Sequence, residues 1–113
     1  MSADDAIDLQ IEIDDHKKKI KLAEALARLE KNKDYKLVIE HEFLTQEPLR
    51  LVGLLSDMNM QNEYHQRGLN MDLRAGSALQ SFFRLIRRTA GEAESALAHS
   101  EEQLAQLRAS GEE

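Results

Sequence analysis

Histidines are the residues of this chain best suited to hold a metal ion or to move protons near neutral pH. No two of them lie four residues apart, the spacing that places two imidazoles on one helical face. His41–Glu42 matches the first two positions of the zinc-protease motif H-E-x-x-H, but Thr45 stands where its second histidine would be. We therefore expect no bound metal. The chain has four histidines: His16, His41, His65 and His99.

Carboxylate pairs such as Asp14–Asp15 and Glu101–Glu102 could in principle act as a general acid and base. They lie in strongly polar runs, whereas acid–base catalysis needs one carboxylate desolvated in a cleft. The sequence also has no cysteine, no glycine-rich phosphate loop and no serine nucleophile motif. We therefore expect no catalytic residue, no cofactor and no enzymatic activity.

Three arginines, Arg84, Arg87 and Arg88, alternate with bulky apolar residues near position 85. Arginine in such surroundings pairs bidentately with carboxylates at protein interfaces. We interpret the three as protein-interface residues, with the acidic residues of 4–15 as potential partners. A solvated basic face is the alternative interpretation.

The net charge of −6 is spread unevenly over the 113 residues. Residues 1–16 carry six acids and no base, residues 89–113 carry a net charge of −5, and the stretch between them is basic. Nucleic-acid binders are usually basic overall, so we do not expect a nucleic-acid partner. A weaker alternative is an assembly factor that contacts nucleic acid through Lys17–Lys21 and Arg84–Arg88. No apolar run approaches the length of a membrane span.

The elements that must position these residues are predicted to be helices. Strong helix formers and helical spacing of apolar residues indicate helices over 16–31 and 35–44, with a strand as the alternative for 35–44 because its Leu-Val-Ile run is also typical of strands. A third helix is expected to begin at Thr45, as its N-cap, and to end near residue 56. Residues 7–13 alternate between apolar and polar types, as strands do. We favour a helix there; an edge strand or an arm on a neighbouring subunit is the alternative.

The longest periodic pattern predicts one helix from 62 to 108. Its last part, residues 92–108, offers only a thin apolar stripe of Leu97, Leu104 and Leu107. A stripe this thin needs a covering helix, from residues 7–31 or from another chain, so these leucines are further candidate interface residues. Since acidic residues surround the stripe, we expect an antiparallel or heterologous contact with a basic surface. Apolar residues from all segments are expected to form one buried cluster: Leu26, Leu29, Val38, Phe43, Val52, Leu55, Leu79, Phe83 and Ile86.

The central stretch resembles a family of small tailed-bacteriophage proteins that are encoded among virion structure and assembly genes. The resemblance covers about residues 16–98 and implies a virion-associated or assembly role. It consists of sequence pattern and contains no catalytic motif. The residues that carry it are 22–36, Val38–Ile39, Phe43–Leu44, Glu47 and Arg50–Val52, and more loosely 54–57, Met60–Gln61 and 83–86.

Together these observations predict an all-α protein with two or three short helices packed on a long C-terminal helix, associating with itself or a partner as coiled coils do. By composition it divides into an acidic arm (1–15), a helical core (16–91) and an acidic C-terminal extension (92–113). The expected function is a non-enzymatic structural or assembly component of a tailed-phage virion, located in the virion and, during assembly, in the host cytoplasm. Its expected partners are further copies and the capsid, portal or tail proteins. The alternative function is a small acidic phage protein that binds and inhibits a host enzyme.

Overall fold

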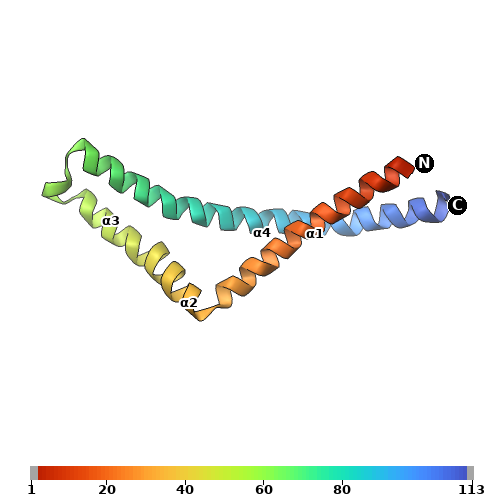
Figure 1. Cartoon of the computed structure of the whole chain (residues 1–113), viewed down its shortest axis with the longest axis horizontal. Helices are drawn as coiled ribbons and strands as arrows, with labels where there is room; N and C mark the ends of the chain where they lie inside the picture. Colours follow the sequence, from red (N-terminus) through yellow and green to blue (C-terminus); the bar gives the residue numbers. More distant parts are fainter. Residues whose placement is uncertain (1–2, 112–113) are drawn as a thin grey trace. The chain divides into compact units, whose positions relative to one another are not determined.

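Helices account for nearly all of the chain in the computed structural model, which describes residues 3–111 (Figure 1). The elements are α1 (Ala3–Lys31), α2 (Lys33–Tyr35), the π-helix η1 (Lys36–Gln46), α3 (Glu47–Leu55), the 3₁₀ turn η2 (Met58–Met60) and α4 (Glu63–Gly111). No strand occurs among these residues, so the region 7–13 is helical. The predicted all-α fold with a long C-terminal helix is confirmed.

The contacts divide the chain into two units. The terminal unit comprises Met1–Leu26 with Leu85–Glu113, and the central unit comprises Ala27–Arg84. Leu26 and Ile86 of the expected core fall in the terminal unit and Phe83 in the central unit, so the prediction of one buried cluster is wrong. Leu29, Val38 and Val52, which were expected in that cluster, are exposed.

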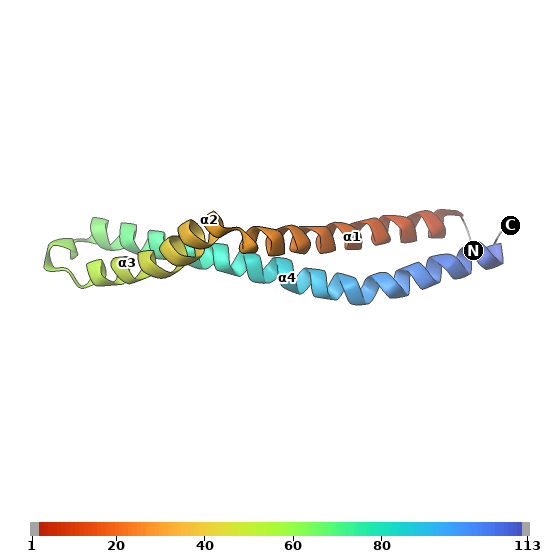
Figure 2. The same ribbon diagram turned by 90° about the horizontal axis from the view of Figure 1, so that it is seen from below.

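The terminal unit is an antiparallel pair made by the first part of α1 and the last part of α4, which run beside each other in Figure 2. The Arg108 guanidinium donates to Gln10 Oε1 at 3.5 Å, and Lys17 Nζ lies 4.0 Å from Glu101. As the residue number rises along α1, the number of the residue opposite it on α4 falls, so the two helices are antiparallel. The buried side chains that the two helices contribute include Ile13 of α1 and Ala93, Leu104 and Leu107 of α4.

The central unit is a second hairpin, in which α2, η1 and α3 run along the first part of α4. At one end the Tyr35 and Phe83 rings lie with their centroids 6.4 Å apart. At the other end the Gln66 amide donates to the Leu55 carbonyl at 3.1 Å and to the Met60 carbonyl at 2.8 Å. The first bond satisfies a carbonyl that the end of α3 leaves without a helical donor, and the second satisfies one at the end of η2.

Asn32 separates α1 from the arm of the central unit that α2, η1 and α3 form. Its backbone is extended and ends α1, and its side-chain oxygen accepts the Tyr35 N–H at 2.9 Å. Asparagine is a favoured helix N-cap for this reason. Asp34, two residues further on, lies in the first turn of α2 and is not its cap.

No helix begins at Thr45. The chain instead stays helical through η1 into α3, and the Thr45 hydroxyl donates to the Glu40 carbonyl, five residues back, at 2.8 Å. The backbone N–H of Glu47 likewise bonds the Glu42 carbonyl. Bonds over five residues define the wide π turn. The prediction that Thr45 caps a new helix is therefore wrong, because its hydroxyl bonds inside a helix that continues from η1 into α3.

The π turns account for a difference in length between the two arms of the central hairpin. The 20-residue step from Tyr35 to Leu55 lies opposite the 17-residue step from Gln66 to Phe83. A π turn holds more residues than an α turn, so it advances less per residue. η1 thereby matches the longer arm to the shorter one.

Candidate protein-interaction surfaces

The thin leucine stripe of residues 92–108 lies in the core of the terminal unit. Leu104 and Leu107 are buried and Leu97 is half-buried. The contacts Gln10–Arg108 and Lys17–Glu101 place α1 along this part of α4, so α1 covers the leucines. Of the two coverings considered from the sequence, the structure shows the one within the chain.

The arginine cluster is exposed: Arg84 belongs to the central unit, and Arg87 and Arg88 belong to the terminal unit. Arg84 donates from Nη2 to the Ser81 hydroxyl on the same helix at 3.0 Å. The register of the terminal unit places the acidic residues 4–15 beside the C-terminal end of α4. Within the terminal unit this register carries the acidic segment past Arg87 and Arg88, so the expected pairing with these two arginines does not form there.

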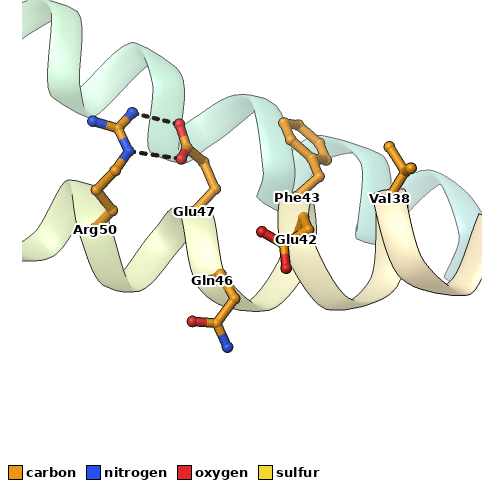
Figure 3. A pocket seen from close by; sticks show the side chains of 6 residues that line it. All are labelled: Val38, Glu42, Phe43, Gln46, Glu47 and Arg50. Atoms are coloured by element: carbon orange, nitrogen blue, oxygen red, sulfur yellow. Dashed lines mark hydrogen bonds and ion pairs between the residues drawn. The ribbon is translucent and has the colours of Figure 1, made fainter.

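A groove of about 490 Å³ runs along η1 and α3 (Figure 3). Carboxylate and amide groups of Glu42 and Gln46 border it together with the apolar side chains Val38 and Phe43. Arg50 closes one end by a bidentate pair with Glu47, with N–O distances of 2.8 and 2.6 Å. The groove is open and mixed in polarity, which suits an extended protein segment better than an enclosed small molecule.

Arg50 fixes the electrostatics of this groove. Its hydrogen bond to Glu47 holds the pKa of that carboxyl below its usual range. The same bond and the Glu47 charge raise the pKa of Arg50, and the charge of Asp72 on α4 adds to the effect. Both partners of the pair are thus held in their charged forms at neutral pH.

A second surface is an unpartnered apolar stripe on α4, here called the α4 stripe. Its members follow one another in steps of four, three, four, three and four residues, the spacing of a coiled-coil seam. Its three large side chains are strongly exposed, at 83% for Tyr64, 62% for Met71 and 51% for Phe82. The α4 stripe consists of Tyr64, Gly68, Met71, Ala75, Ala78 and Phe82.

The α4 stripe is distinct from the face of α4 that forms the core of the hairpin. In the central unit that core face includes Leu69 and Phe83, which are buried. A hollow of about 480 Å³ lies on the stripe itself, where Gly68 has no side chain to fill the space beside Tyr64 and Met71. Arg67 and Asp72 border the hollow. It is the shape that receives a side chain from a facing helix.

The sequence contains a signal for this surface. Beside the periodic apolar pattern that predicts the helix from 62 to 108 lies a second pattern of the same period. Alanine and glycine at half of its positions hid it, since these residues contribute little to hydrophobicity although they permit close helix approach.

His16 stands out among the four histidines because both nitrogens of its ring are enclosed. It lies on the face of α1 that includes the buried Ile13, and neither nitrogen bonds any residue that the structure describes. His65 instead pairs with Asn62, whose Oδ1 accepts the His65 N–H at the start of α4. Over residues 3–111, no three histidine, aspartate or glutamate side chains gather as they would around a metal ion.

No protein-family model, curated protein or solved structure matches the chain. Each helix within the described residues is too short in its apolar stretches, or too charged, to cross a membrane.

Proposed function

We propose that the protein is a non-enzymatic structural or assembly component that acts through helix-mediated protein–protein contacts. The observation that carries the proposal is the excess of exposed apolar side chains. Among the described residues, more large apolar side chains are exposed than buried, and the exposed ones include members on α1, η1, α3 and α4. Contiguous exposed apolar surface of this kind marks sites of protein association.

The setting that we propose for these contacts is the virion of a tailed phage, with capsid, portal or tail proteins and further copies of the chain as partners. The resemblance of residues 16–98 to small phage proteins encoded among virion genes supports it. In this setting the protein is in the host cytoplasm while the particle assembles and in the virion afterwards.

Mass spectrometry of purified virions tests the proposal. A structural component is expected at a fixed copy number relative to the major capsid protein, through repeated gradient purification. An assembly factor that leaves before maturation is expected in immature particles at a fixed ratio. Absence from both would contradict the proposal and favour the alternative, an acidic inhibitor that binds a host enzyme; affinity purification from infected cells would then recover that enzyme.

A further inference from the structure

We propose that the α4 stripe is a self-association surface, on which a second copy of the chain places its own α4 stripe in parallel and in register. This inference deepens the proposed function by naming one of the contacts. It is built from residues of the central unit alone.

The spacing of the α4 stripe is that of a coiled-coil seam. Six consecutive seam positions from Tyr64 to Phe82 are exposed, and every one is apolar or glycine. Two helices that carry this pattern pack side chains of one helix into holes between four residues of the other. Gly68, Ala75 and Ala78 keep the seam narrow, so the two backbones can approach closely.

The hollow beside Gly68 offers room for a side chain of a second copy. In a parallel, in-register pair, Met71 of the second copy faces the hole that Gly68, Met71, Asp72 and Ala75 surround. The hollow overlaps this hole, since the first three of these residues line it, and it continues from there towards Met60 and Tyr64. Methionine adapts its shape to irregular spaces, which suits it to this position.

The charged residues beside the α4 stripe select the orientation of the pair. Arg67 directly precedes one seam residue and Asp72 directly follows the next, so a parallel pair sets Arg67 of each copy beside Asp72 of the other. An antiparallel pair that used the whole stripe would instead set Asp72 against Asp72 and Arg74 against Arg74. The intrahelical bond of Arg67 to Glu63, at 2.8 Å between highly exposed side chains, is weak enough to be exchanged.

Cysteine crosslinking tests the proposal directly, because the chain has no cysteine of its own. A disulfide requires two Cα atoms within about 7 Å. Ala75→Cys and Ala78→Cys should therefore each give a covalent dimer on mild oxidation of the full-length protein. Ser77→Cys, exposed on the same helix but off the stripe, is the matched control and should remain uncrosslinked.

Sedimentation equilibrium supplies the second measurement. The wild-type protein should be in monomer–dimer equilibrium, and Ala78→Glu should weaken the dimer by tenfold or more, about 1.4 kcal/mol. Arg67→Glu should also weaken it, and adding Asp72→Arg to that variant should restore most of the loss. Circular dichroism at the same concentrations shows that each variant is folded.

Four results would overturn the proposal: a monomeric wild type at all concentrations, crosslinking of the Ser77→Cys control as fast as of the stripe variants, no crosslinking of either stripe variant although the wild type dimerises, or no rescue by Asp72→Arg. The third would indicate antiparallel pairing, which sets Ala75 opposite Met71 and Ala78 opposite Gly68. A monomer that is nevertheless present in virions would leave the proposed function standing with a heterologous partner on the stripe. If the protein dimerises but is absent from virions and immature particles, the self-association would stand and the proposed function would fail.

Discussion

Replacing His16 by leucine probes the least favourable group in the terminal unit. Both nitrogens of its ring are enclosed without a hydrogen-bond partner among the described residues, on the face of α1 that packs against α4. Enclosing a polar group in this way costs roughly 1–3 kcal/mol as judged from protein mutations. Leucine is similar in bulk and has no polar atom. We therefore expect His16→Leu to raise the free energy of unfolding by roughly 1–3 kcal/mol.

Urea denaturation followed by circular dichroism measures this change as a shift of the midpoint at unchanged slope. Hydrogen exchange of residues 3–26 localises it, since the added protection should appear in the terminal unit. His99→Leu is the matched control: His99 is exposed on α4 of the same unit, so its replacement should change the free energy by less than about 0.5 kcal/mol. If His16→Leu lowered the stability, or raised it no more than the control did, the His16 ring would have to be satisfied in solution and the argument would be refuted.

Alanine at Gly76 or Gly91 should raise the free energy of unfolding by about 0.5–1 kcal/mol, because both lie inside α4 and no atom lies within 4 Å of the added Cβ; urea denaturation would show a loss if the added methyl met an obstacle. Truncation after Gly91 removes the helix that covers residues 3–26, so these amides should lose exchange protection while those of the central unit keep theirs; protection retained in α1 would contradict the pairing. Glu47→Gln should lower the melting temperature at pH 7 more than at pH 3. Arg50 lowers the pKa of Glu47, so the stabilisation is present above about pH 4.3 and is lost as the pH falls through the lowered pKa; an equal difference at both pH values would argue against the pair.

The long helix could be predicted because its buried side recurs over many turns without interruption. Residues 7–13 are ambiguous for a physical reason. Ile7 and Ile11 are exposed on one side of α1, whereas Leu9 and Ile13 lie on the covered side, the latter with 2% of its surface exposed. Two stripes of four-residue spacing, offset by two, produce the same alternation as a strand.

The π-helix could not be inferred from helix propensity, since η1 is made of ordinary helix and strand formers. A signal was present in the spacing: Tyr35, Ile39, Phe43, Glu47 and Leu51 are all at least partly covered and follow one another by four. In an α-helix each such step turns about 40° too far, so the five would wind around the axis. Wider turns bring them back to one side.

The single core failed as a prediction because it assumed that all wide apolar faces are covered. In a two-helix unit each helix has one neighbour, so only one side of it is covered. Leu29, Val38 and Val52 lie outside that side. Periodicity shows that a face is apolar; what covers it depends on the number of neighbours.

The surplus residues held in η1 also bear on how the length of this protein can change in evolution. Loss of one residue between 36 and 46 could be absorbed by converting a π turn into an α turn, while Tyr35 stays on Phe83 and Leu55 stays at Gln66. The same loss from α4 opposite would rotate every later residue of that helix by about 100° and take the buried face away from its partner. Insertions and deletions among natural variants should therefore accumulate in η1 and be excluded from the facing part of α4.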